Sequence, residues 1–289
     1  MVSEVIDHNQ RFLGILDRLS EKSIDDYYNP YQLFQWPDKL PEDMWWMSPE
    51  LTTTHDTEFA GTLDERQLQR LSRFESVNFY SLNVHGIREL LIEVINRIHT
   101  SGFEAPSEFF HHFVGEENEH MWFFAQFCLR YGGKIYRSPA PRGLAVPAPK
   151  FESLLVFLRI MIFEELVDHF NSAMGADQRL HETVRDINRI HHQDESRHIA
   201  FGRELVQLLY QHVHADATEA ELDGVSDYIK RYMTYSFESL YNPQVYRDAG
   251  LDQPLEVRRA LLNSPARVRA EDRTFRKTAK FLRKTGIIR

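Results

Sequence analysis

Four long segments of the chain repeat their apolar residues at the spacing of an α-helix, and this repetition constrains the fold more than any other feature. The segments lie near residues 64–99, 107–131, 151–174 and 177–213. Short breaks follow the first and third segments, and a long Gly- and Pro-rich stretch follows the second. Short connections make antiparallel helix pairs, and the long one lets the chain cross the end of a bundle. The pattern therefore predicts an all-α protein built on a four-helix bundle.

The regions on either side of these segments add to the bundle without forming a second domain. The N-terminal region mixes short helical pieces with Pro and Trp, which predicts an irregular segment that wraps the bundle. Two further helices are expected near 218–242 and 264–285, where Ser264 and Pro265 supply an N-cap and a first-turn proline. We expect a single domain, residues 1–289, with the wrapping segment at 1–63, the bundle at 64–213 and additional helices at 214–289.

Charge and hydropathy exclude several classes of protein. The net charge is −9 and the pI is about 5.9, whereas nucleic-acid binding needs a basic face. No run of about 18 apolar residues is present, so we expect no membrane span. The first residues lack the basic and then apolar pattern of a signal peptide. The single cysteine, Cys128, excludes an intramolecular disulfide and suits a reducing compartment, so we expect a cytoplasmic protein.

Ionisable residues interrupt the apolar face of the second segment. Successive positions on that face are Phe110, Phe113, Glu117, His120 and Phe124. A glutamate and a histidine inside a stripe of phenylalanines are costly to bury unless a partner compensates them. The stripe therefore predicts that Glu117 and His120 point inward and share a ligand.

The fourth segment carries a similar set in the sequence HHQDESRHIAFG. His191, Glu195 and His198 are spaced at i, i+4 and i+7, within about 60° of one another around the helix axis. Two Glu-x-x-His pairs on separate helices of one bundle indicate a metal pair bridged by carboxylates. Such a site also takes one inward glutamate from each of the other two helices.

Candidates for these two glutamates lie in the third and first segments. In the third, Glu164 shares its face with apolar residues, whereas Glu165 is more easily placed outward, so we prefer Glu164. In the first, counting back from a turn near Phe103 places Glu89 level with the glutamate of the second segment, with Glu93 as the alternative.

Further polar residues are suited to support such ligands. Asp194 and Arg197 are placed to hydrogen-bond a ligand histidine on a neighbouring helix and to neutralise charge. Asp168, one turn after Glu164 on the same face, is a third candidate for this supporting role. Carboxylates and imidazoles without sulfur suit iron or manganese.

At these residues the sequence resembles the ferritin-like carboxylate-bridged diiron proteins, whose hallmark is the duplicated Glu-x-x-His arrangement. More narrowly it resembles the p-aminobenzoate N-oxygenase family, because His191 stands one turn before Glu195, where that family has a third histidine ligand. The similarity covers roughly residues 48–213. It implies a ferritin-like bundle and a ligand set of Glu89, Glu117, His120, Glu164, His191, Glu195 and His198.

The resemblance implies a non-haem diiron monooxygenase that uses O2 and two iron ions, or manganese, to oxygenate a small molecule. N-oxygenation of an amine or arylamine is the leading interpretation, and we hypothesise that the third imidazole favours a persistent peroxo species. C–H hydroxylation or desaturation, and a non-enzymatic iron-handling role, are the alternatives. The expected aromatic substrate pocket is lined by Leu82, Phe113, Phe124, Phe157 and Met161.

Turnover of such an enzyme requires two electrons from outside the chain. The sequence has no glycine-rich fingerprint for a flavin or nicotinamide cofactor. We therefore expect an external electron donor, either a reductase or a small ferredoxin-like carrier. A homodimer is the expected assembly.

Overall fold

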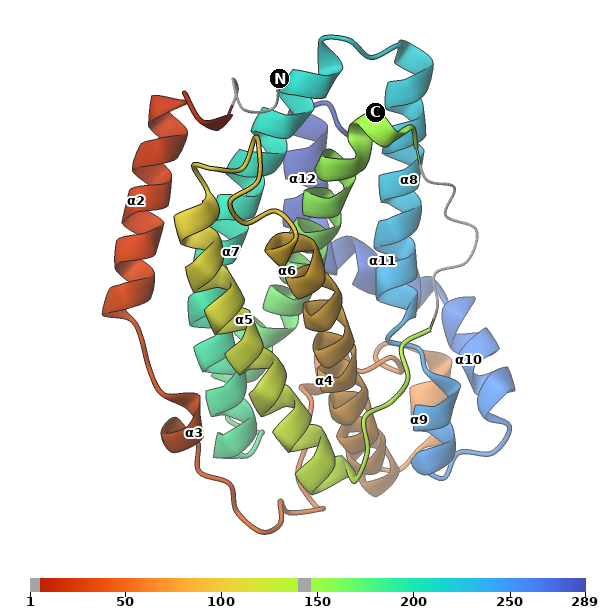
Figure 1. Ribbon diagram of the computed structural model, residues 1–289. Helices are drawn as coiled ribbons and strands as arrows, with labels where there is room; N and C mark the ends of the chain where they lie inside the picture. Colours follow the sequence, from red (N-terminus) through yellow and green to blue (C-terminus); the bar gives the residue numbers. More distant parts are fainter. Residues whose placement is uncertain (1–5, 140–146) are drawn as a thin grey trace.

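A computed structural model describes residues 6–139 and 147–289 of the chain, and the molecule is built from helices (Figure 1). Within these two ranges the only β-structure is an isolated bridge between Trp45 and Leu180. Four long helices lie side by side and form the central bundle. They are α4 (Glu65–Ile95), α5 (Ser107–Phe127), α6 (Glu152–Ala176) and α7 (Glu182–His214).

The ends of the bundle helices follow from local side-chain chemistry. Asp64 and Gln67 form a reciprocal capping box at the start of α4, and the His181 side chain accepts from the backbone of Thr183 at the start of α7. The π-helical turn Cys128–Gly132 extends α5, and Gly133 then ends it in the left-handed region at a φ of 68°. The four predicted bundle helices are confirmed, with boundaries shifted by a few residues.

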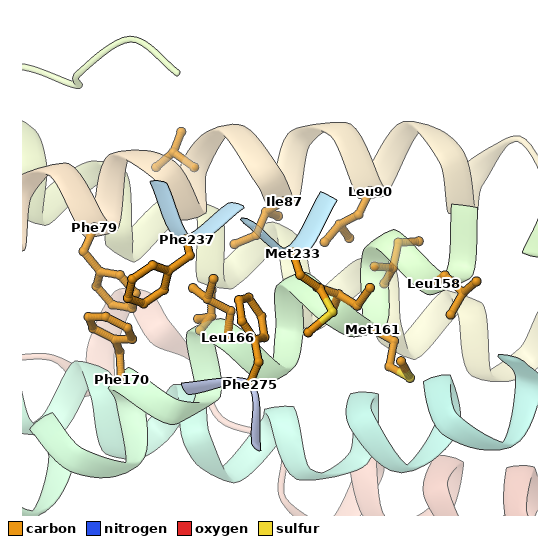
Figure 2. Packing of buried hydrophobic residues seen from close by; sticks show 14 of the residues in the cluster. Phe79, Ile87, Leu90, Leu158, Met161, Leu166, Phe170, Met233, Phe237 and Phe275 are labelled. Carbon is orange, nitrogen blue, oxygen red and sulfur yellow. The ribbon is translucent and has the colours of Figure 1, made fainter. Parts of the chain in front are cut away.

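Small residues allow the bundle helices to approach closely. Gly202 of α7 packs on Met161 of α6, and Gly86 of α4 lies directly beneath the ring of Phe163 of α6. Farther along the contact between α4 and α6, Phe79 of α4 stacks on Phe170 of α6 with the ring centroids 4.9 Å apart (Figure 2). The Gly86–Phe163 and Phe79–Phe170 contacts make α4 and α6 antiparallel. Gly202 on Met161 and Gly175 on Arg189 make α6 and α7 antiparallel as well, so α4 and α7 run parallel.

Additional helices cover two sides of the bundle. α2 (Gln10–Asp25) packs against α5 and α7, and α8 (Glu219–Glu238) packs on α6 at the opposite side (Figure 1). Met233 and Phe237 of α8 contribute to the buried cluster between these helices (Figure 2). The remaining short helices are α3 (Pro30–Leu33), η1 (Pro49–Leu51), η2 (Glu58–Thr62), η4 (Pro149–Phe151), α9 (Pro243–Asp248), α10 (Pro254–Leu262), α11 (Pro265–Thr274) and α12 (Arg276–Lys284).

Two expectations for the flanking regions need correction. The N-terminal region contains a regular amphipathic helix, α2, in addition to irregular backbone. The predicted final helix begins as expected, with Ser264 accepting from the backbone of Ala266, but it breaks into α11 and α12 at Phe275. The buried ring of Phe275 contacts Phe237, so tertiary packing interrupts a segment whose sequence favours one helix.

Among the described residues, no helix combines the length and hydropathy needed to cross a bilayer.

Candidate metal centre

Four ionisable side chains from α5 and α7 converge in the interior of the bundle. They are Glu117 and His120 of α5 and Glu195 and His198 of α7. One ligand atom from each lies within 4.8 Å of the others. All four residues are at most 2% exposed, so water cannot compensate their charges. The structure therefore brings together both predicted Glu-x-x-His pairs.

Two further predicted residues join this cluster. His191 Nε2 lies 2.9 Å from Glu195 Oε1, one turn away on α7. Glu164 of α6 is 2% exposed and is close enough to hydrogen-bond Glu195. Six of the seven predicted ligands thus meet, and they come from α5, α6 and α7.

The polar atoms of this cluster fit a metal centre better than they fit one another. His198 Nδ1 lies 2.8 Å from Glu117 Oε1, yet the nitrogen lacks an aligned hydrogen-bond partner. The same is true of His191 Nε2, of both carboxylate oxygens of Glu195, and of one oxygen each of Glu117 and Glu164. Buried polar atoms in native proteins are almost always paired, so a group of unpaired lone pairs around one point indicates a cation site.

Electrostatics within the cluster show how tightly these groups are coupled. Burial raises the pKa of Glu164, and the negative charges of Glu195 and Glu117 raise it further, to well above its usual value. Burial would lower the pKa of His120, but the carboxylates of Glu117 and Asp194 outweigh this and raise it to about 10. Protons therefore compensate the buried carboxylates when no metal is bound, and metal loading must displace them.

Two of the histidines are fixed by carboxylates on their outer side. His120 Nε2 lies 3.0 Å from Asp194 Oδ2, which leaves Nδ1 facing Glu117. His198 Nε2 lies 2.8 Å from Glu116 Oε2. A carboxylate on the far nitrogen holds a ligand histidine in one tautomer and one orientation.

Arg197 connects these two carboxylates to each other and to the N-terminal segment. Its side chain is 4% exposed and donates to Asp194 at 2.6 Å, to Glu116 at 2.8 Å and to Asp26 at 3.2 Å. Tyr28 adds a hydrogen bond of 2.9 Å to Asp194. The sequence indicated Asp194 and Arg197 for this supporting role, but Glu116 and Tyr28 were not predicted.

Asn171 supports the third histidine. It lies on α6, two helical turns after Glu164 on the same face, and its side-chain amide contacts His191 Nδ1. This i+7 spacing was a signal in the sequence that could have indicated Asn171. Asp168, the predicted supporting residue on α6, instead pairs with the exposed His192.

Glu89 does not reach the cluster, so the expected inward position for it is wrong. Its side chain is exposed and lines a cavity of about 370 Å³ between α4, α6 and α8. The alternative, Glu93, forms an ion pair with Arg97 at 2.8 Å. Tyr80 of α4 stacks on Phe124, so the residue level with Glu117 is Ile87, two positions before Glu89. A shift of two residues rotates a helical side chain by about 200°.

The predicted pocket residues are packed into the core around the cluster. The rings of Phe113 and Phe124 contact His198 and His191 respectively. Four of the five residues are fully or almost fully buried, and Leu82 is half-buried. None of the five lines the cavity between α4, α6 and α8 or the one near His169, Phe170 and Ala173, farther along α6. The residues in question are Leu82, Phe113, Phe124, Phe157 and Met161.

The chain is similar to one protein family and to several solved structures. Residues 10–286 match the family model described as "P-aminobenzoate N-oxygenase AurF". Among solved structures, an R2-like ligand-binding oxidase variant with an aerobically reconstituted Mn/Fe cofactor matches with a TM-score of 0.46 and 13% identity, covering 89% of this chain and 92% of that chain. An anaerobically reconstituted variant matches with a TM-score of 0.47 and 14% identity over the same shares. No curated protein matches.

Proposed function

Because the chain belongs to the p-aminobenzoate N-oxygenase family, and is therefore an oxygenase, we propose that it N-oxygenates a small-molecule amine or arylamine at a diiron centre. The observation that carries this proposal is the group of buried carboxylate and imidazole atoms that lack an aligned hydrogen-bond partner in the described part of the chain. An iron-handling protein without enzymatic activity does not fit this family. Oxidation of carbon instead of nitrogen is an outcome that the experiment below can distinguish.

The residues that would hold two iron ions, with manganese as the alternative metal, come from three helices. Two such ions supply the capacity to reduce dioxygen next to a bound substrate. In N-oxygenation one oxygen atom goes to the amine nitrogen and the other leaves as water, which consumes two electrons and two protons. The proposed ligands are Glu117, His120, Glu164, His191, Glu195 and His198.

The chain itself orients these ligands and excludes water from them. Asp194, Glu116 and Asn171 each hold the outer nitrogen of one histidine. Phe113 and Phe124 pack against the imidazole rings and are at most 2% exposed. Exclusion of water strengthens the electrostatic interactions of the site and protects reactive species.

We further propose that substrate binds in the 370 Å³ cavity between α4, α6 and α8. Each helix contributes side chains at helical spacing, so three regular stripes form its walls. Leu90, Ile160 and Phe163 line this cavity, and Phe163 directly precedes the proposed ligand Glu164. The main lining residues are Gly86, Glu89, Leu90, Glu93, Ile160, Phe163, Tyr228, Tyr232 and Tyr235.

The polar groups of this cavity favour an amine over a carboxylate. Of the described residues that line it, Glu89 and Glu93 are acidic and Arg159 alone is basic. Arg159 is already engaged by the Tyr228 hydroxyl at 3.4 Å and by Glu93 at 3.8 Å. Phenol rings and carboxylates together suit an aromatic or protonated amine.

An external electron donor and a homodimeric assembly belong to the same proposal, as does a cytoplasmic location. The electron donor is proposed because N-oxygenation consumes two electrons. The homodimer and the location are proposed from the sequence.

The test is turnover by iron-loaded, chemically reduced protein exposed to ¹⁸O2. p-Aminobenzoate and a panel of arylamines and alkylamines serve as substrates, and mass spectrometry locates the label. We expect one ¹⁸O atom on nitrogen, and a higher KM for Glu89→Gln with no change in bound iron. Label on carbon alone would contradict N-oxygenation while leaving the oxygenase assignment in place.

A matched pair of variants on α7 controls for folding. Glu195→Ala should lose bound iron and turnover together, because its carboxylate lies between the imidazoles of the cluster. Gln193→Ala, on the exposed side of the same helix, should keep both. Equal turnover in the two variants would refute the proposed site.

A further inference from the structure

None of the four acidic residues of α4 points at the metal centre. Glu65 and Glu89 are exposed, and Glu93 pairs with Arg97. Glu75 is buried, but it accepts hydrogen bonds from Thr53 outside the cluster. A carboxylate-bridged metal pair in a four-helix bundle takes an inward glutamate from all four helices. α4 therefore departs from that pattern.

Two contacts of Tyr80 show which part of α4 lies beside the cluster. Its hydroxyl accepts from Asn188 of α7 at 2.6 Å, and its ring stacks on Phe124 of α5. Because α4 and α7 run parallel, the step of three residues from Tyr80 to Asn83 matches the step from Asn188 to His191, so Asn83 lies level with His191. Asn83 shares the inner face of α4 with Tyr80 and, one turn later, with the buried Ile87.

The Asn83 side chain is 0% exposed, and its amide nitrogen and its amide oxygen differ in their hydrogen bonding. Its amide nitrogen donates to the backbone oxygen of Phe79 at 2.9 Å, and this contact fixes which end of the amide is oxygen. Within residues 6–139 and 147–289 the oxygen, Oδ1, has no hydrogen-bond partner. A buried acceptor without a donor costs about 1–3 kcal/mol. Amide oxygens are common ligands of hard cations, which would satisfy it.

We propose that Asn83 supplies the α4 ligand of the metal centre as a neutral amide oxygen, in place of a carboxylate. This inference rests on the proposed metal centre. The centre then contains three carboxylates, those of Glu117, Glu164 and Glu195. Two divalent ions among three carboxylates keep one uncompensated positive charge, which weakens binding of the second ion and attracts an anionic external ligand.

The test is a titration of metal-free full-length protein with Mn(II), followed by equilibrium dialysis and metal analysis. The wild type should bind two ions, the second more weakly. Asn83→Asp restores the fourth negative charge and should tighten the second ion by about tenfold or more. Asn83→Leu removes the oxygen at similar size and should weaken that ion by about tenfold or more, with the first retained.

Asn78→Asp is the matched control, because Asn78 is also buried on α4 but bonds to Leu240 and Asn242 instead. It should leave both Mn(II) affinities unchanged, and melting curves of all metal-free variants report folding. Wild-type affinities in both Asn83 variants would overturn the inference while the metal centre stands. A folded wild type that binds no metal would overturn the proposed function itself.

Discussion

The three histidines of the cluster each use both ring nitrogens. One nitrogen faces the other ligands, and the second is held by Asp194, Glu116 or Asn171. A neutral imidazole has one donor and one acceptor nitrogen, so a histidine in a packed core needs an aligned partner at each. The inner nitrogens of His191 and His198 lack such a partner among the described residues, as expected of metal ligands.

A second buried carboxylate, Glu75, gives a prediction about stability and pH. It is 3% exposed, and burial raises its pKa to about 7 despite the hydrogen bonds from Thr53. The folded protein keeps the proton of Glu75 up to this pKa, whereas the unfolded chain releases it near pH 4.5. Protonated Glu75 therefore makes its full contribution to the free energy of unfolding below pH 4.5. As the pH rises to about 7 that contribution falls by about 3 kcal/mol.

Urea denaturation of metal-free wild type and Glu75→Gln from pH 4.5 to pH 8 measures this effect. The free energy of unfolding of Glu75→Gln minus that of the wild type should increase by about 3 kcal/mol from the low to the high end of that interval. Gln193→Ala, which removes an exposed side chain that does not ionise, should show a constant difference. A constant difference for Glu75→Gln as well would show that Glu75 ionises normally.

Sequence reasoning located the inward residues of α5, α6 and α7 because each interrupts an apolar stripe. Its one misplaced glutamate, Glu89, came from a count through a turn. α4 ends at Ile95, and the turn that follows does not keep helical geometry, so the count was off by two residues. Asn83 and Glu116 gave no signal, since a lone amide or one more glutamate is common in any helix.

At the scale of elements, long helices were predictable and short ones were not. Each bundle helix repeats its apolar face over many turns, which averages out local exceptions. The short helices α9 and α10 have too few residues for such a pattern, and their formation depends on packing against α4 and on each other. The break at Phe275 has the same origin, because the buried ring decides the backbone direction.

The contact between α4 and α6 depends on Gly86. A Cβ atom at this position would lie 2.3 Å from Cζ of Phe163, which lines the proposed substrate cavity. We expect Gly86→Ala to lower the free energy of unfolding by about 1–3 kcal/mol, because the ring or the helix must move. Thermal or urea unfolding measures this change.

Gly115→Ala provides the control for helix propensity. Gly115 is exposed in the middle of α5, and nothing lies within 4 Å of the added Cβ. Alanine there should stabilise the protein by about 0.5–1 kcal/mol. If Gly86→Ala were equally stabilising, the close packing of Phe163 on α4 would be wrong.

At the scale of the whole molecule, distant parts of the chain close around one interior point. α2 covers α5 and α7, and the segment after it brings Asp26 and Tyr28 to the network around Arg197 (Figure 1). On the opposite side, α8 covers α6 and completes the proposed cavity. The flanking helices thus shield the cluster and shape the approach to it, while the four bundle helices position the ligands.

Side chains of α5, α6 and α7 are proposed to hold two metal ions at this point. X-ray diffraction from crystals of iron-loaded protein, collected on both sides of the iron absorption edge, would locate these ions. We expect two anomalous peaks, each within bonding distance of carboxylate oxygens and imidazole nitrogens among Glu117, His120, Glu164, His191, Glu195 and His198. Peaks elsewhere, or an intact cluster without iron under saturating metal, would contradict it.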